Sequence, residues 1–137
     1  MPRFIAFDFG TRRIGIAITD SGAMIAAPEC TCSPQEWPQV VDRLLHAEPC
    51  AGLIVGKPGL ISGDETHSSG EIEGFAKALS KRYPNTPLHF VDEDYSSREA
   101  SAAMVMGGMR KSKRREKGNL DKVAAAIILQ RFLDQRS

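Results

Sequence analysis

The stretch RFIAFDFGTRRIGIAITD, residues 3–20, predicts the centre of the fold. Its two apolar runs, Phe4 to Phe9 and Ile14 to Thr19, are rich in residues that favour strands. Residues 10–13 between them, Gly-Thr-Arg-Arg, have the composition of a tight turn. We therefore expect two antiparallel strands joined as a β-hairpin.

Asp8 interrupts the first of these apolar runs. Successive side chains of a strand point to opposite faces, so Asp8 shares a face with Ala6, whereas Phe7 and Phe9 point to the other. A carboxylate in a buried strand costs free energy unless it is paired, hydrogen-bonded or bound to a metal. The pattern predicts a metal-binding carboxylate on a rigid strand; the alternative is a strand-end Asp that caps the turn at Gly10.

The remaining elements follow from hydrophobic periodicity and capping residues. We expect strands at residues 23–27, 51–56 and 88–91, and helices that open at Ser33, Ser68, Ser96 and Asn119. Three strands in succession, followed by alternating helices and strands, predict an α/β fold. We expect a mixed five-stranded sheet, with three antiparallel strands and then two parallel ones, flanked by helices.

Length and composition limit the class of protein. The chain has 137 residues, so we expect residues 1–137 to form a single domain. Its three cysteines, Cys30, Cys32 and Cys50, lack the spacing of a disulfide framework, which favours reduced thiols and a cytoplasmic location. We expect no signal peptide, no transmembrane segment and no membrane partner.

Three acidic residues stand at the ends of predicted elements: Asp8, Glu93 after the fifth strand, and Asp121 in the first turn of the last helix. If the first and fifth strands are neighbours, Asp8 and Glu93 lie close together. Clustered carboxylates repel one another without cations, and oxygen ligands suit Mg²⁺ or Mn²⁺. Such ions can activate a water for phosphodiester cleavage.

Each of the two later acids also has a purely structural explanation. Glu93 lies between Asp92 and Asp94, which is typical of a solvated acidic loop. Asp is favoured in the first turn of a helix by the macrodipole, which would explain Asp121 without any metal.

Residues 110–117, RKSKRREK, hold six basic residues and one acidic residue, a net charge of +5 in a chain whose formal net charge is +1. Next to Asp121, these cations could hold the phosphates of a nucleic acid. The segment lacks aromatic residues, so we expect contact with the backbone rather than with bases. The alternative is a solvated, mobile loop. The candidate phosphate ligands are Arg110, Lys111, Lys113, Arg114 and Arg115.

With these features placed, the sequence resembles the YqgF/RuvX family over nearly its whole length. Four blocks in order carry the resemblance: residues 8–17 (DFGTRRIGIA), 55–58 with 63–66 (VGKP and GDET), 92–100 (DEDYSSREA), and 118–121 leading into 124–130 (GNLD and AAAIILQ). The family has an RNase H-like fold related to the resolvase RuvC. Its members are described as Holliday junction resolvases and as nucleases that mature the 5′ end of pre-16S ribosomal RNA.

The resemblance implies a metal-dependent endonuclease, a hydrolase, in which Asp8, Glu93 and Asp121 bind one or two Mg²⁺ or Mn²⁺ ions. Cleavage would leave a 5′-phosphate and a 3′-hydroxyl. Thr11, Arg12 and the loop after Gly56, including Lys57, would flank the substrate backbone. The expected partner is structured RNA or branched DNA, and the expected state is a monomer or a weak homodimer.

The chain departs from the family pattern at three positions. Asp94 replaces the family's usual arginine, Lys57 replaces a leucine, and Lys122 replaces a common serine. Asp94 keeps open the hypothesis of a nucleic-acid-binding module with weakened catalysis. A DNA junction resolvase is the other alternative, and it should dimerise to make two symmetric cuts. An actin-like ATPase has a similar first loop, but that fold needs two such domains and this chain has room for one.

Overall fold

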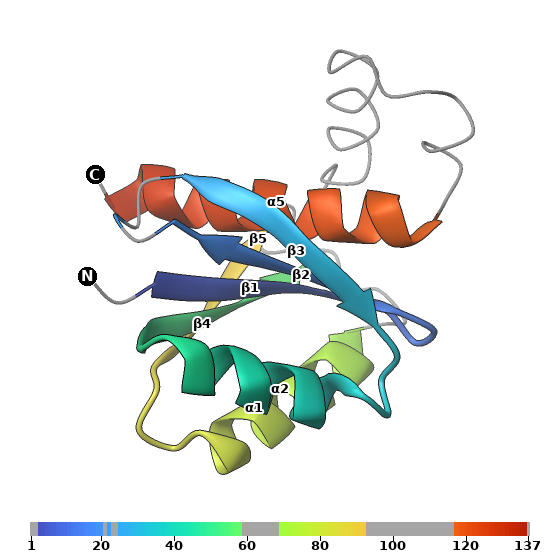
Figure 1. The fold of residues 1–137 in the computed structure, drawn as a ribbon. Coiled ribbons are helices and arrows are strands. Elements are labelled where there is room, and N and C mark those ends of the chain that lie inside the picture. The colour runs from blue at the N-terminus through green and yellow to red at the C-terminus, as the bar shows by residue number, and fades with distance from the viewer. Residues whose placement is uncertain (1–2, 21, 23–24, 59–68, 93–116, 137) are drawn as a thin grey trace.

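A five-stranded mixed sheet forms the middle layer of the fold (Figure 1). The computed structural model describes residues 3–20, 22, 25–58, 69–92 and 117–136. Helix α5 covers one face of the sheet, and helices α1 and α2 cover the other (Figure 1). In chain order the described elements are β1 Arg3–Phe9, β2 Ile14–Thr19, β3 Ala26–Cys32, α1 Trp37–Ala47, β4 Cys50–Lys57, α2 Ser69–Arg82, β5 Leu88–Asp92 and α5 Lys117–Arg136.

The strand order is β3-β2-β1-β4-β5. β1 pairs antiparallel with β2 and β2 antiparallel with β3, whereas β1–β4 and β4–β5 are parallel pairs. This confirms the expected sheet of three antiparallel strands and then two parallel ones. The two parallel pairs bring the carboxyl ends of β1, β4 and β5 to the same end of the sheet, where binding sites of α/β sheets commonly form.

The supposition that the first and fifth strands are neighbours is wrong, because β4 lies between them. The reason is visible in the apolar run of β4. Leu53, Ile54 and Val55 are completely buried, which requires a helix layer on each face and a paired strand on each side. The carboxyl ends of β1 and β5 are thus separated by the width of one strand.

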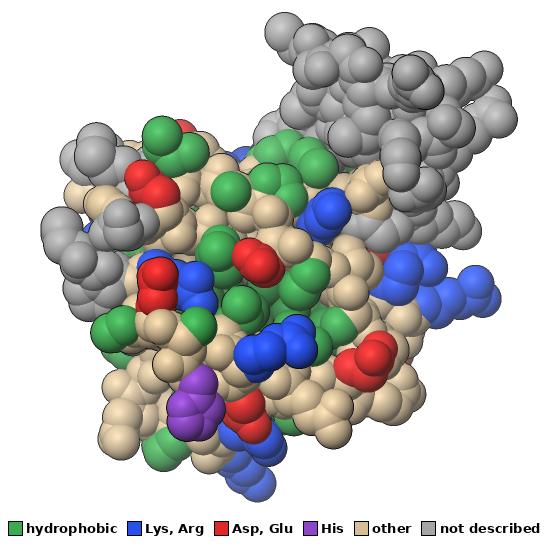
Figure 2. Space-filling model, viewed as in Figure 1, with side chains coloured by type: hydrophobic (Ala, Val, Ile, Leu, Met, Phe, Trp, Pro, Cys, Tyr) green, Lys and Arg blue, Asp and Glu red, His purple; other side chains and the backbone are tan. Residues whose placement is uncertain are grey.

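The two faces of the sheet carry different side chains. The face under α1 and α2 packs large residues, among them Phe7, Phe75 and Leu79. The face under α5 packs a mixture, with Ala6, Ala17 and Ala125 beside large residues such as Phe4 and Leu129. This confirms the alternation predicted for β1, with Ala6 and Phe7 on opposite faces. Seen from the β3 side, hydrophobic side chains gather between the helix layers, with charges of both signs scattered around them (Figure 2).

Several element boundaries differ from the prediction. β3 begins at Ala26 and continues to Cys32, beyond the predicted end at Ala27, because pairing with all of β2 extends it. Glu36 does reach back to the Ser33 N–H, at 3.1 Å, as in a capping box. The α-helix nevertheless begins later, at Trp37, with Pro38 in its first turn.

Three predicted features lie outside the described residues: the acid Glu93, the helix expected to open at Ser96, and the basic residues Arg110 to Arg115. None of the helices described here is long and apolar enough to cross a membrane. The three cysteines are free thiols, and burial raises the pKa of Cys32 to about 11, which keeps it protonated and unreactive.

Candidate active site

Asp8 lies near the carboxyl end of β1, on the face covered by α5. It follows Ala6 on that face, and its direct partner across the β1–β2 ladder is Gly15. Directly opposed residues of an antiparallel pair are about 5 Å apart at Cα and point to the same face. On the other side of β1, the register Phe7–Val55 brings Asp8 level with Gly56 of β4. The Asp8 side chain therefore has a glycine on each neighbouring strand, so neither neighbour crowds its carboxylate.

Gly15 is the residue that brings α5 down onto this position. A Cβ at Gly15 would lie 2.1 Å from the carbonyl oxygen of Asp121 and 2.8 Å from the Lys122 nitrogen. The α5 backbone thus occupies the space that a side chain at Gly15 would fill. Because Asp8 opposes Gly15 on the same face, this contact places Asp8 beside the turn of α5 that carries Asp121.

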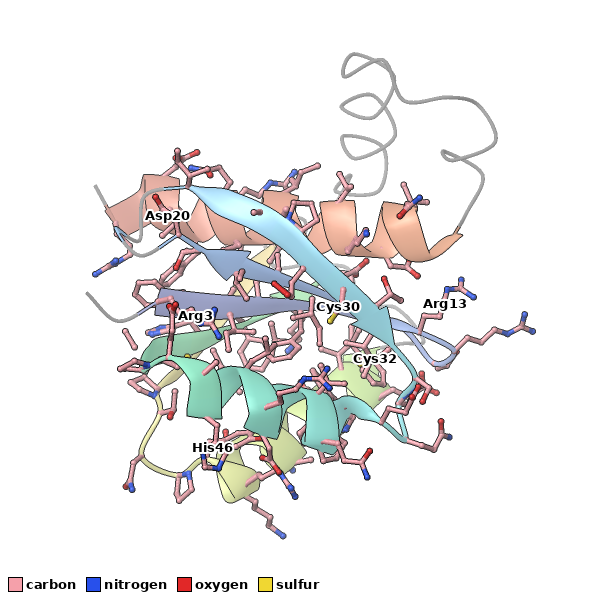
Figure 3. The ribbon with its side chains drawn as sticks, viewed as in Figure 1. Arg3, Arg13, Asp20, Cys30, Cys32 and His46 are labelled. Atoms are coloured by element: carbon pink, nitrogen blue, oxygen red, sulfur yellow. The ribbon has the colours of Figure 1, made fainter. Side chains whose placement is uncertain are left out.

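Asp121 is held by an ion pair with the hairpin turn. The Arg13 Nε donates to Asp121 Oδ2 at 2.8 Å, and 36% and 23% of the two side chains are exposed. Arg13 stands at the end of the β1–β2 hairpin (Figure 3). The contact joins the turn after Asp8 to α5 across more than a hundred residues of sequence.

The expected place of Asp121 within its helix was wrong. The helix begins at Lys117, two residues before the predicted start, and its first turn holds no acidic residue. The macrodipole acts mainly on the first turn, so it explains Asp121 poorly. The ion pair and the contact with Gly15 remain as the observed reasons for its position.

The end of β5 is also fixed to α5. Arg131 Nη1 donates to the carbonyl oxygen of Asp92, the last residue of β5, at 2.8 Å. Glu93, the next residue, lies outside the described residues. The hydrogen bond therefore fixes Asp92, the residue before Glu93, at the same end of the sheet as the end of β1.

The candidate substrate ligands divide into two groups. Thr11 and Arg12 are exposed in the turn that follows Asp8, close to the Arg13–Asp121 pair. Lys57, at the end of β4, points to the other face, where its Nζ contacts Glu73 Oε1 on α2 at 2.8 Å. The structure thus brings Thr11 and Arg12 to the side of Asp8 but not Lys57. Arg110, Lys111, Lys113, Arg114 and Arg115 lie outside the described residues.

The donor set at this edge fits a hard divalent cation. Within the described ranges, which do not include Glu93, no three His, Cys, Asp or Glu side chains are close enough together to hold a metal. Asp8 and Asp121 supply carboxylate oxygens from two rigid elements, as Mg²⁺ and Mn²⁺ prefer. The guanidinium on Asp121 shows that this carboxylate already attracts a positive charge.

Two of these residues were not recognised from the sequence. Gly15 carries the one local signal, because a glycine inside an apolar strand indicates close backbone approach. Arg13 belongs to the predicted turn, and nothing in its local sequence indicates a partner at position 121.

Comparison with solved structures defines the class of fold. Thermus thermophilus RuvC in complex with a Holliday junction substrate aligns over 99% of this chain and 96% of its own, with a TM-score of 0.55 and 18% identity. The Fowlpox virus resolvase, solved with Holliday junction DNA, aligns over 98% of both chains, with a TM-score of 0.55 and 12% identity. The fold is therefore the RNase H-like fold of the RuvC resolvases.

Sequence comparison gives the family. Residues 2–135 match the family model described as RuvX, Holliday junction resolvase. A Chlorobaculum tepidum protein is 38% identical over 98% of this chain and 95% of its own length. One from Christiangramia forsetii is 35% identical over 97% and 98%. Both carry the name "Putative pre-16S rRNA nuclease". The chain belongs to the RuvX family, and it is a hydrolase of the nuclease class.

Proposed function

We propose that this protein is a divalent-metal-dependent endonuclease that acts in the 5′-end maturation of pre-16S ribosomal RNA. The names of the relatives supply the RNA substrate, and the family supplies the nuclease class. The free thiols fit a reducing cytoplasm, where ribosomes are assembled. We also propose that residues 1–137 work as one domain.

In this proposal Asp8, Glu93 and Asp121 hold Mg²⁺ or Mn²⁺. When bound, the metal would polarise the phosphate and supply a nucleophilic water at neutral pH. The protein's own part is to hold the carboxylates in place before substrate arrives. Asp8 is fixed by the β1 ladder, and Asp121 by the contact of α5 with Gly15.

The cationic side chains would position the RNA. Thr11 and Arg12 lie in the exposed turn after Asp8, where a hydroxyl and a guanidinium can bind phosphate oxygens. We propose that the basic residues Arg110 to Arg115 extend this phosphate contact. Lys57 lies on the opposite face of the sheet, next to α2, and would contact RNA that extends beyond the end of β4 to that face.

The observation that carries the proposal is the backbone contact at Gly15. A Cβ at Gly15 would lie 2.1 Å from the Asp121 carbonyl oxygen, so the turn of α5 that carries the family's catalytic acid lies against the strand position opposite Asp8. A structural role for Asp121 as a helix-capping residue would not require that approach.

The test is a cleavage assay on two end-labelled substrates, a pre-16S RNA 5′ fragment and a four-way DNA junction, with Mg²⁺, with Mn²⁺ and with EDTA. The wild type should cut the RNA only with metal. Asp8→Asn and Asp121→Asn should each lose cleavage by a factor of about 100 or more while melting near the wild-type temperature. Asp134→Asn is the matched control, because it removes a carboxylate from the exposed end of α5.

Two other outcomes would replace the proposal. Cutting of the DNA junction alone would make the protein a resolvase, a function that the two junction-bound structural neighbours favour. A resolvase should also sediment as a dimer, because two symmetric cuts need two sites. RNA binding without any metal-dependent cleavage would indicate a binding module, with Asp94 as the first residue to revert to arginine.

A further inference from the structure

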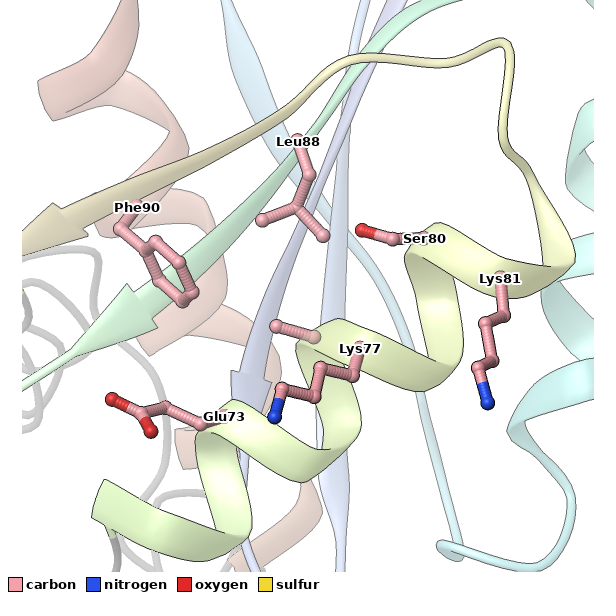
Figure 4. Close-up of a pocket in the computed structure, with 7 residues that line it drawn as sticks. Glu73, Lys77, Ser80, Lys81, Leu88 and Phe90 are labelled. Carbon is pink, nitrogen blue, oxygen red and sulfur yellow. The ribbon is translucent and has the colours of Figure 1, made fainter.

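A groove of about 470 Å³ runs between α2 and β5, on the face of the sheet opposite Asp8 (Figure 4). β5 is the edge strand of the described sheet, so the groove lies beside the edge of that sheet. Its floor is apolar, formed by Ala76, Leu88 and Phe90. Its wall along α2 carries Lys77 and Lys81, which are four residues apart and therefore on the same side of the helix.

Phe90 is the exceptional residue of this groove. Its side chain is 41% exposed, and it is one of two large hydrophobic residues with such exposure in the part of the chain that the structure describes. The Lys57 Nζ lies 5.4 Å from the centre of its ring. An accessible aromatic ring beside cations is the arrangement with which proteins bind single-stranded nucleic acid, through base stacking and phosphate contact.

The groove is connected to the candidate active site through the sheet register. Phe90 stands two residues before the end of β5, and Lys57 is level with Asp92, the residue before Glu93. The groove therefore begins near the end of the sheet at which β1, β4 and β5 terminate, which is also the end that carries Asp8. In the described sheet β5 is the last strand on that side, so the groove and the strand that carries Asp8 are separated by β4 and β5 alone.

We propose that this groove binds a single-stranded stretch of the RNA substrate next to the point of cleavage. One base stacks on Phe90, and the phosphates that follow contact Lys77 and Lys81. The inference rests on the proposed function. It adds a second contact region, which would make the protein bind RNA with a single-stranded tail more tightly than RNA without one.

The charges favour RNA over a protein partner as occupant. Glu73, the one acidic residue among those that line the groove, forms an ion pair with Lys57 and also feels the charge of Lys77, four residues further along α2. The three lysines around the groove, Lys57, Lys77 and Lys81, therefore outweigh this one carboxylate. The groove thus presents net positive charge beside an aromatic ring, which complements phosphate and base together.

The experiment measures Kd by fluorescence anisotropy in EDTA, where metal-dependent cleavage is blocked. The probes are a labelled RNA hairpin with a single-stranded tail of about 12 nucleotides and the same hairpin with a blunt end. Phe90→Leu keeps the apolar bulk but removes the ring, and it should weaken binding of the tailed RNA about tenfold. Phe90→Trp should bind like the wild type, and the blunt hairpin should distinguish none of them.

Lys77→Gln should weaken binding of the tailed RNA and reduce the salt slope of log Kd by about 0.7, the value for one phosphate contact on a single strand. Arg43→Gln is the matched control, since it removes one exposed cation from α1, outside the groove. Ile25→Ala is the control for Phe90, because Ile25 is the other exposed large hydrophobic residue, at 64%.

Equal Kd values for wild type, Phe90→Leu and Lys77→Gln on the tailed RNA would overturn the proposal. If the wild type still cut that RNA with Mg²⁺, the proposed function would stand and only the groove assignment would fail. A wild-type dimer in sedimentation velocity that Phe90→Leu dissociates would also overturn it, by assigning the groove to a second copy of the chain. If the wild type neither bound nor cut either RNA, the proposed function itself would fail.

Discussion

The two faces of the sheet are packed by opposite means. Under α1 and α2 the layer is aromatic: the Phe75 ring lies 5.4 Å from Phe7, 4.9 Å from Phe9 and 5.3 Å from Trp37. Under α5 the sheet also presents large residues, Phe4, Ile54 and Val91, but its apolar side chains beside Gly15 are only those of Ala6 and Ala17, and at Gly15 it presents no side chain at all. Large side chains hold α1 and α2 away from the strands, whereas small ones let the α5 backbone touch β2.

This difference separates stability from positioning. The aromatic layer removes a large apolar area from water, and none of its side chains contacts a carboxylate of the candidate active site in the part of the chain that the structure describes. The α5 layer also buries apolar side chains, but in addition it fixes a helix backbone against a strand at the position opposite Asp8. Substitutions under α1 and α2 should therefore lower mainly stability, whereas a substitution at Gly15 should also lower cleavage activity.

The largest effect on stability is expected at Phe75, which is 5% exposed and contacts three aromatic rings. Phe75→Ala should lower the free energy of unfolding by about 3–5 kcal/mol, through lost burial and the cavity left behind. Urea denaturation would measure the loss, and a cleavage assay well below the melting temperature should show activity per folded molecule near that of the wild type. A loss of activity without a loss of stability would mean that the aromatic layer does position the site.

A smaller effect on stability, with a larger effect on function, is expected at Gly15. Gly15→Ala places a methyl group 2.1 Å from a backbone oxygen, so α5 must move. The expected cost is about 3 kcal/mol, the upper part of the range for overpacking, and cleavage should fall even where the protein is fully folded. Urea denaturation and the cleavage assay on one preparation would separate the two losses.

Gly74→Ala is the matched control for that change. A Cβ at Gly74 meets nothing within 4 Å, and Gly74 lies inside α2. The substitution should stabilise the protein by about 0.5–1 kcal/mol, because alanine favours the helix. Full activity in Gly15→Ala would contradict the view that the close approach of α5 builds the site.

The comparison also explains what the sequence could and could not predict. The alternation of Ala6, Phe7 and Asp8 predicts which face each side chain occupies, because period two is a local property of a strand. The neighbour of β1 could not be predicted, since pairing with β4 depends on a parallel crossover rather than on local pattern. Phe90 looked like any residue of an apolar strand, and only the edge position of β5 exposes it.

The candidate site shows the same division. Asp8 could be recognised because a carboxylate in an apolar strand is costly. The contact of Arg13 with Asp121 could not, because it joins two segments whose approach depends on the packing of α5 over Gly15. The ion pair is a tertiary consequence of the small-residue face.

A still smaller effect is expected when that ion pair is removed. Arg13 neutralises the Asp121 carboxylate in the absence of metal, so it competes with a divalent cation for the same oxygen. Partly exposed ion pairs contribute about 0–1 kcal/mol, which corresponds to at most about a fivefold change in affinity. Arg13→Gln should tighten Mn²⁺ binding by up to that factor, measured by calorimetry without RNA.

Arg12→Gln is the control for Arg13, because it removes the same charge from the next position of an exposed turn. It should change Mn²⁺ affinity less than Arg13→Gln does. Equal changes in the two variants would show that only the general positive field matters, and weaker Mn²⁺ binding in Arg13→Gln would mean that Arg13 supports the metal-binding geometry of Asp121.

The smallest effect is expected on the aromatic face, at the polar contact that joins α1 to α2. Asp42 accepts hydrogen bonds from Arg82 and from the Tyr83 hydroxyl, and these hold the Asp42 pKa at about 2. Because this folded-state pKa is below the value of about 3.9 for an unfolded chain, the contact stabilises the fold above about pH 4 and loses its effect as the pH falls toward 2. Asp42→Asn should therefore lower the urea midpoint of unfolding at pH 6. The difference in midpoint between this variant and the wild type should shrink between pH 4 and pH 2. A difference that stayed constant down to pH 2 would mean that Asp42 acts through packing rather than through its charge, and the polar contact between the two helices would then contribute nothing that depends on ionisation.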